Sequence, residues 1–202
     1  MKARARLGHA AREPGAVSDD EVISAGVLFR QHAAFVANFL VRLGVDRSEV
    51  DDVIQDVFMI AHRRGGYRPG AARPTTWLAD IALRVNANRR RGQRRSRVSA
   101  DMGPVEHAID PATTPGDALQ LRQSLDRVQA ALDAVDEDKR VVFILFELEG
   151  ESCDSIAAGL GVPVGTVYSR LHGARKQFAK AHARIVARDR RVQPSASAGV
   201  RA

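Results

Sequence analysis

The chain of 202 residues carries 31 Lys and Arg against 24 Asp and Glu, which gives a formal net charge of +7. Its 45% hydrophobic and 5% aromatic residues suffice for aliphatic cores, while no membrane-length apolar run, no secretory signal and no cysteine besides Cys153 can be found. These properties exclude a membrane span and a disulfide framework, and we expect a soluble cytoplasmic protein without membrane insertion.

The first part of the chain predicts a disordered arm at 1–17 and a small helical domain at 18–96. A capping box formed by Ser18 and Glu21 is expected to begin the first helix, which ends at Gly44. The second helix is expected to begin at Asp46 or Ser48, with this apolar stripe: Val50, Val53, Ile54, Val57, Phe58 and Ala61.

A loop at 65–74 separates the second predicted helix from a third, for which Thr75 or Thr76 is the expected cap. This third helix is expected to bury Trp77, Leu78, Ile81, Ala82 and Val85. Its distal half is the stretch RVNANRRRGQRRSR, Arg84 to Arg97, whose seven arginines equal the net charge of the whole chain. Such local positive charge indicates phosphate or anionic lipid as a partner.

The basic run is sorted by direction rather than uniformly charged. At about 100° per residue, five side chains share a sector of about 60° on the third helix, and Arg89 and Arg90 point elsewhere. The five are Trp77, Arg84, Asn88, Arg91 and Arg95. Periodicity alone leaves two roles open for Trp77, packing in the core or contact with a nucleic-acid base.

The second part of the chain predicts a linker at 97–117, a second helical domain at 118–187 and a disordered tail at 188–202. The linker is rich in prolines and turn formers, and the domain holds four helical segments: 118–132, 137–148, 152–160 and 163–185. No segment alternates with period two. The sequence therefore predicts an all-α protein of two small helical domains joined by a flexible linker.

The stretch from Cys153 to His172 has the pattern of a helix-turn-helix. A short helix meets Gly161, which supplies the positive φ of a tight turn, and a second helix follows Pro163. Apolar positions of the second helix are expected to be buried, namely Val167, Leu171, Ala174 and Phe178. Its polar side suits bases and phosphates through Thr166, Ser169, Arg170, Arg175 and Lys176. The alternative is an ordinary helical hairpin with a solvated basic face.

Other motifs carry less chemistry. Asp52, Gln55 and Asp56 project together from the second helix, and on spacing alone a solvated face is favoured over a docking surface. Histidines are scattered, and no carboxylate pair, phosphate-binding loop or nucleophile is set up for catalysis. We expect no enzymatic activity, no cofactor and no metal site.

Three stretches together resemble the sigma-70 family, especially its extracytoplasmic-function (ECF) branch. They are DDVIQDVFMIAHRR, TTWLADIALRVNANRRR and GVPVGTVYSRLHGARKQF, in the family's order and at its separations. The resemblance covers roughly residues 20–96 and 118–182. It implies a region 2-like domain, a linker and a region 4-like helix-turn-helix domain.

The resemblance also implies roles and partners. Asp52, Gln55, Asp56 and Phe58 would dock on core RNA polymerase, which reverses the interpretation that spacing alone favours. The sector that contains Trp77, Arg84, Asn88, Arg91 and Arg95 would face the minus-ten element of promoter DNA. Thr166, Ser169, Arg170, Arg175 and Lys176 would face the minus-thirty-five element. Members of the family are often held inactive by an anti-sigma factor.

Departures from the family pattern and rival functions remain. Pro74 precedes the T-W-L motif in place of an aromatic or aliphatic residue, Arg84 replaces a frequent Asn, Cys153 a usual Tyr, and Gly173 a usual Arg. The chief rival is a stand-alone helix-turn-helix regulator of duplex DNA, which would need neither the acidic helix nor the Trp77 helix. An RNA-binding protein is the more distant rival, since it would not need the helix-turn-helix.

Overall fold

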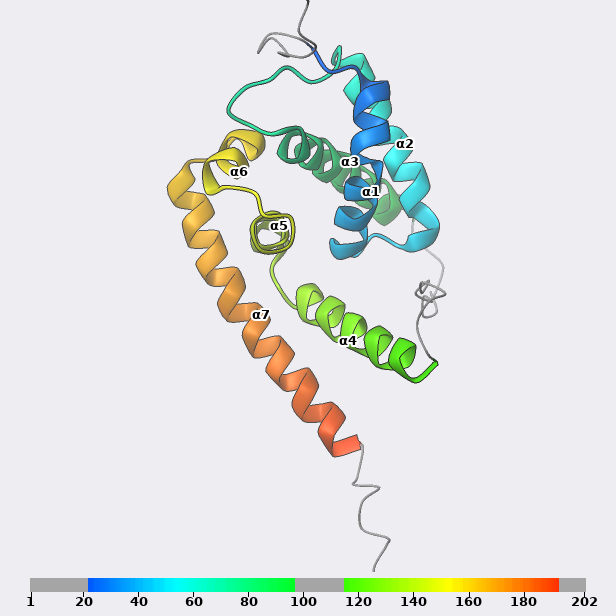
Figure 1. Ribbon diagram of the computed structural model, residues 1–202, viewed down its shortest axis with the longest axis vertical. Coiled ribbons are helices and arrows are strands. Elements are labelled where there is room, and N and C mark those ends of the chain that lie inside the picture. Colours follow the sequence, from blue (N-terminus) through cyan, green and yellow to red (C-terminus); the bar gives the residue numbers. More distant parts are fainter. Residues whose placement is uncertain (1–21, 97–114, 193–202) are drawn as a thin grey trace, which may run out of the picture.

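A computed structural model describes residues 22–96 and 115–192, and every regular element within them is helical (Figure 1). We call 22–96 the first half and 115–192 the second half. The first half contains α1 (Ala25–Arg42), α2 (Arg47–Arg63) and α3 (Pro74–Ser96). The second half contains α4 (Pro115–Asp133), α5 (Glu137–Phe143), the π-helical turn η1 (Ile144–Leu148), α6 (Cys153–Leu160) and α7 (Val164–Val192).

The helix starts follow local capping chemistry. Ser24 caps α1 by accepting from the backbone of Val27, whereas the expected capping box at Ser18 and Glu21 lies outside the described residues. Asp46 caps α2 as predicted, accepting from Ser48 at 2.9 Å.

The third helix begins earlier than predicted, so the expectation of a Thr75 or Thr76 cap is wrong. It starts at Pro74, because proline has its φ preset for a helix and its missing N–H is not needed in the first turn. The Thr76 hydroxyl instead donates to the carbonyl of Arg73 at 2.9 Å. Pro74, which departs from the family pattern, is therefore the first residue of α3.

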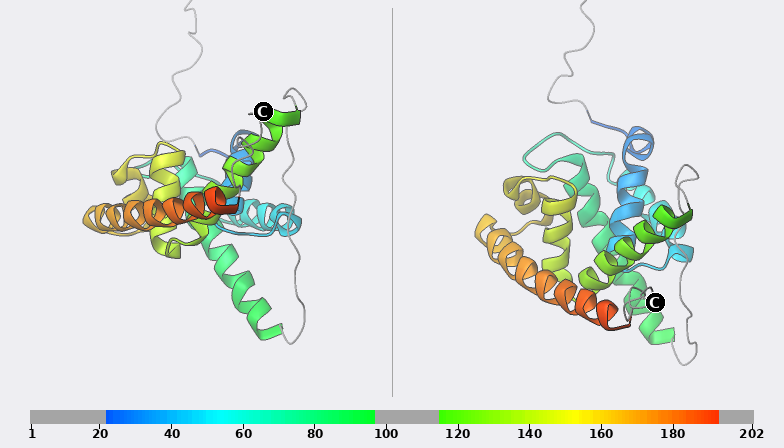
Figure 2. Two further views of the ribbon diagram at one scale, coloured as in Figure 1. Left: turned by 90° about the horizontal axis from the view of Figure 1, so that it is seen from below. Right: turned by 60° about the horizontal axis from the view of Figure 1, so that its bottom comes forward.

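The first half packs its three helices around the predicted apolar stripes. The stripe of α2 and the inner side of α3 are buried or nearly so, and Trp77 alone among the predicted α3 residues is only partly buried. An isolated antiparallel bridge joins Ile23 to Tyr67 and ties the loop before α3 to the entry of α1. Beyond this body, the distal end of α3, which carries the basic run, projects outward (Figure 2).

In the second half, α4 begins at Pro115, inside the predicted linker, and the predicted helix 137–148 is α5 continued by the π turn η1. The predicted tail is wrong over its first five residues, because α7 continues from the expected tail start at 188 to Val192. Between Gly173 and Pro194 the sequence contains no helix breaker, so nothing ends the helix earlier. The predictions for 1–17 and 97–114 concern residues outside the described ranges.

The two halves lie side by side (Figures 1 and 2), and they share one continuous hydrophobic cluster. The all-helical, two-part architecture is confirmed, but the sequence did not predict that the parts would pack on one another. The closest approach is between α6 and the start of α3, where Gly159 lies against Thr76. A Cβ on Gly159 would stand 2.6 Å from the Cβ of Thr76, so only glycine allows this approach.

Candidate functional site

The aromatic end of the α3 sector is built from Trp77 and Tyr67. Their rings meet edge to face with centroids 5.7 Å apart, and Tyr67 is buried while Trp77 is partly buried. Burial raises the pKa of the Tyr67 hydroxyl, which donates to the carbonyl of Ala72. Trp77 thus packs on the loop before α3 and still presents part of its ring to solvent, so both roles considered for it are compatible with its position.

The polar part of that sector is exposed. Arg84, Asn88 and Arg91 lie on the solvent side of α3, and Arg91 donates to the side-chain oxygen of Asn88. Arg84 is paired at 2.9 Å with Asp80 one turn earlier, an acid that the helical-wheel prediction did not include. The side chain of Arg95 lies outside the described residues. A phosphate bound at Arg84 would therefore compete with a carboxylate.

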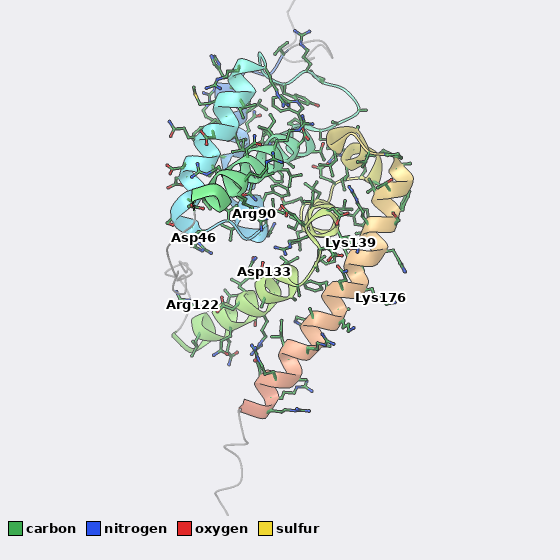
Figure 3. All side chains as sticks on the ribbon, turned by 180° about the vertical axis from the view of Figure 1, so that it is seen from behind. Asp46, Arg90, Arg122, Asp133, Lys139 and Lys176 are labelled. Carbon is green, nitrogen blue, oxygen red and sulfur yellow. The ribbon has the colours of Figure 1, made fainter. Side chains whose placement is uncertain are left out.

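The two arginines predicted to point elsewhere reach other elements. Arg89 contacts the acidic face of α2, at 3.3 Å from Asp56 and 3.9 Å from Asp52. Arg90 pairs with Glu137 of α5 at 2.9 Å, and Figure 3 shows it directed toward the second half. The basic run is therefore divided among solvent, α2 and α5.

An open apolar groove of about 750 Å³ lies between α1 and α2. Phe29 and Met59 are about half-exposed along it, and the ring of Phe29 meets Phe58 at 5.1 Å, edge to face. Small residues form much of the rest of its lining: Ala25, Gly26, Ala33, Ala34 and Ala37. Gln55 lines this groove, so one predicted docking residue stands at its rim.

The predicted docking residues are thus not one continuous patch. Phe58 is 7% exposed and forms the wall of the groove, whereas Asp52 and Asp56 are exposed on the side that faces Arg89. Sequence reasoning missed Phe29 and Met59. Apolar residues at exposed helical positions were the available signal, but the sequence does not say which positions a neighbouring helix leaves uncovered.

The helix-turn-helix is formed as predicted. Gly161 has φ 65° at the turn, and Ser152 caps α6 by accepting from the N–H of Ser155 at 3.1 Å. Val167, Leu171 and Ala174 are buried, and Phe178 is partly buried on the ring of Phe143 with centroids 4.9 Å apart. Cys153, the first residue of α6, is buried.

The polar residues of α7 are not equally available. Ser169 is exposed and donates to the carbonyl of Thr166 at 3.0 Å, and Lys176 is exposed. Arg170 instead pairs with Asp138 of α5 at 3.1 Å. Arg175 pairs with Glu147 at 2.6 Å and lies 5.5 Å from the ring centroid of Phe146. The side chain of Arg175 is thus held against η1 and points to a different side of α7 from that of Lys176.

Gly173 stands where the family usually has an arginine. In the structure a cation from another helix lies over this glycine, which the sequence did not predict. The side chain of Lys139, from α5, passes over Gly173, where an added Cβ would stand 3.2 Å from its Cε. Lys139 is held by Asp136 at 2.5 Å, and this contact lowers the pKa of Asp136 and raises that of Lys139. A cation from α5 therefore stands beside the polar side of α7.

The contact between the halves, which we call the seam, is polar at its edges. Its first-half residues include Arg42, Leu43, Arg73, Thr75, Thr76 and Arg90, and its second-half residues include Gln129, Glu137, Arg140, Glu149, Glu151, Ser155 and Gly159. Ser155 accepts from the N–H of Arg73 at 3.0 Å and lies 3.1 Å from the Thr76 hydroxyl.

Glu151 is the most deeply buried acid of the seam, with its side chain 4% exposed. One of its oxygens accepts from the Thr75 hydroxyl, and the other has no hydrogen-bond partner among the described residues and stands 3.8 Å from Arg73. Polar groups at the start of α3, the helix that carries the basic run, therefore have their hydrogen-bond and ionic partners in the second half.

No group of three or more His, Cys, Asp or Glu within 22–96 and 115–192 could hold a metal ion. Among the helices of those ranges, none has the length and apolar character needed to cross a membrane.

Comparison with known proteins agrees with this geometry. Residues 28–96 match Sigma-70 region 2, and residues 125–178 match Sigma-70, region 4. The RNA polymerase sigma-H factor of Pseudomonas aeruginosa is 34% identical over 163 residues, which cover 77% of this chain and 83% of that protein. The ECF RNA polymerase sigma factor SigE of Mycolicibacterium smegmatis is 33% identical over 154 residues, 75% of this chain and 58% of that protein.

Two solved structures are also similar. The structure of CnrH in complex with the cytosolic domain of CnrY superposes with a TM-score of 0.52 at 26% identity, covering 77% of this chain and 85% of that chain. The sigma factor RpoE of Bartonella quintana, solved with the anti-sigma factor NepR, gives a TM-score of 0.57 at 22% identity, covering 76% and 95%. The latter likeness concerns the fold alone.

Proposed function

Since this chain belongs to the ECF branch of the sigma-70 family, whose members are non-enzymatic subunits that direct RNA polymerase to promoters, we propose how its two halves divide that work. The first half docks on core polymerase through the α1–α2 groove and its acidic rim, and reads the minus-ten element with the exposed sector of α3. The second half reads the minus-thirty-five element with the start of α7. We place this activity in the cytoplasm, where polymerase and chromosome meet.

One observation carries the docking proposal: a groove with exposed Phe29 and Met59 is lined by the exposed Asp51, and Asp52 and Asp56 are exposed farther round the same helix, α2. Its small residues let a partner helix approach closely, and the two large apolar side chains would be covered by it. The carboxylates of Asp52 and Asp56 would attract basic side chains of that partner. A stand-alone helix-turn-helix regulator has no use for such a groove.

On α3 and α7 the chemistry suits DNA. Stacking on the exposed part of Trp77 and contacts from Asn88 would hold unpaired bases, and exposed arginines would bind phosphates. The hydroxyls of Thr166 and Ser169, near the start of α7, suit base edges in the major groove.

Reading both elements at once requires the halves to separate. The elements are centred about 25 base pairs apart, which at about 3.4 Å per pair amounts to about 85 Å. In the structure, α6 touches the start of α3. The packed arrangement is therefore a closed form, and we propose that an anti-sigma factor is a partner able to hold it; CnrH is similarly seen with another protein, CnrY.

Reconstitution with core polymerase tests the proposal. We expect the chain to co-elute with core polymerase and to direct transcription from a promoter that has both elements. Asp52→Arg with Asp56→Arg should abolish co-elution, because it replaces both carboxylates with cations.

A compensated variant separates docking from folding. The reversed side chains would also face Arg89, which pairs with both carboxylates. Adding Arg89→Asp restores that internal attraction but leaves the outer surface basic. If the triple variant regains core binding, the two acids act only within the chain and their docking role is wrong.

A further inference from the structure

The outer side of α7 carries a row of cations that extends well past the helix-turn-helix. Lys176, Lys180, Arg184 and Arg191 are all exposed, and we call them the α7 stripe. Among residues 22–96 and 115–192, none of the four has an ion-pair partner. Figure 3 shows Lys176 directed away from the body of the molecule.

The rest of the helix is arranged so that nothing neutralises the stripe. Asp189 is the only acid of α7, and it is held by Arg127 of α4 at 2.8 Å. Ile185 and Asp189 line the contact with α4, so α4 covers a different side of α7. The stripe therefore remains open along its whole length.

The stripe also shares its direction with the start of the helix. At about 100° per residue, its four cations and the two hydroxyl residues Thr166 and Ser169 all fall within a sector of about 80°. Arg175, which is fixed to Glu147, falls outside this sector. A surface on which Thr166 and Ser169 rest would therefore meet the stripe as well.

The length of the helix decides what the stripe would meet. From Ser169 to Arg191 the helix advances about 33 Å at about 1.5 Å per residue. The major groove is only about 12 Å wide and curves around the duplex, so a straight helix lying in it at one end crosses its rim farther on. That rim is the phosphate backbone, which attracts unpaired Lys and Arg.

We propose that the α7 stripe binds duplex phosphates that flank the minus-thirty-five element. The protein helix α7 then contacts about one turn of the DNA duplex, and not only through the first turns of α7. This inference rests on the proposed function of the second half. It adds a sequence-independent contact that would set the salt dependence of binding. The occupant is DNA backbone; a solvated face and an acidic protein surface are the alternatives that the experiment addresses.

The test uses the full chain with core polymerase on promoter duplex. Lys180→Gln, Arg184→Gln and Arg191→Gln together remove three charges and keep side chains that suit a helix. If each cation binds one phosphate, the slope of log K against log salt should become shallower by about 2.7, at about 0.9 per contact. Hydroxyl-radical footprints should lose protection beside the minus-thirty-five element but keep it over the element.

A charge-preserving variant is the matched control. Lys180→Arg, Arg184→Lys and Arg191→Lys should retain the slope and the footprint. An unchanged slope for the glutamine variant would show a solvated face, and a loss of core co-elution at unchanged slope would show a protein contact; either overturns the inference. If the unaltered chain bound core polymerase but no promoter, the proposed function itself would fail, which is a different result.

Discussion

A single methyl group placed at Gly159 should open the seam. In Gly159→Ala the new Cβ would stand 2.6 Å from the Cβ of Thr76, 2.9 Å from its hydroxyl oxygen and 3.0 Å from its backbone carbonyl carbon. Carbon atoms pack best at about 3.5–4.0 Å, so α6 and α3 must part by about 1 Å. Backbone atoms are among those struck, so a side-chain rotation cannot relieve the clash.

The magnitude follows from the cost of overpacking. Forcing an extra methyl group into a packed contact costs about 1–3 kcal/mol, which at about 1.4 kcal/mol per tenfold lowers the ratio of closed to open form by about 5- to 150-fold. Alanine also favours a helix over glycine by about 1 kcal/mol. That gain stabilises α6 in both forms, so it does not reclose the seam.

The assay is the apparent affinity for core polymerase, together with a distance between labels on the two halves. If only the open form binds, its larger population lowers the apparent Kd by up to the same factor, and the label distance should broaden and lengthen. Gly165→Ala in α7 is the matched control, because nothing stands within 4 Å of its new Cβ. Equal behaviour of the two variants in both measurements would refute the reasoning.

Two further outcomes test the same contacts and the pH response. Ser155→Ala leaves the N–H of Arg73 without its acceptor, and should lower the free energy of unfolding by about 1–3 kcal/mol in urea melts. Ser169→Ala, at an exposed site, should change the free energy of unfolding by less than about 0.5 kcal/mol. Equal losses in the two variants would contradict the role of the seam in stability. Burial lowers the pKa of His32 in the folded chain below its ordinary value near 6.5, so its contribution to stability is present above that value and is lost as the pH falls through the folded pKa. His32→Gln should flatten the dependence of the melting temperature on pH between about 7 and 5, and an unaltered profile would exclude His32 as its source.

Helices and their inner faces were readable from the sequence because burial imposes periodicity. Val167 and Leu171 are spaced for one side of a helix, and Gly161 supplies the positive φ of the turn, so the helix-turn-helix could be predicted from local rules. Helix ends were less readable. Pro74 starts α3 although Thr75 and Thr76 are the better-known caps, because proline has its φ preset for a helix. The N–H of the preceding Arg73 finds its acceptor in Ser155, far away in sequence.

The candidate sites were predicted as sets of residues but not as surfaces. Asp52 and Phe58 were correctly placed on one helix, yet one is exposed and the other is buried against Phe29. Arg170 and Arg175 were expected to be available for DNA, but each has a carboxylate partner on α5 or η1. Such pairings depend on which helices become neighbours, and that information is not local.

In each ion pair that crosses the seam between residues 22–96 and 115–192, the cation belongs to the first half. Arg42, Arg73 and Arg90 belong to the first half, and they face Glu149, Glu151 and Glu137 of the second, respectively. Arg73 directly precedes α3, and Arg90 lies within the part of α3 that is proposed to read DNA, on a different side of the helix. In the closed form these cations are therefore occupied by carboxylates, where an open form would offer them to phosphates.

The ion pairs across the seam differ in how strongly salt screens them. Arg90 and Glu137 are both about half-exposed, at 49% and 52%, so their pair is screened by salt and contributes little alone, whereas the buried Glu151 is shielded. Added salt should weaken the exposed pairs before the contacts at Ser155 and Gly159. The seam therefore consists of a salt-sensitive rim around a packed centre. Only glycine fits at position 159 in that centre, and this packing sets how firmly the helices that are proposed to read DNA are kept together.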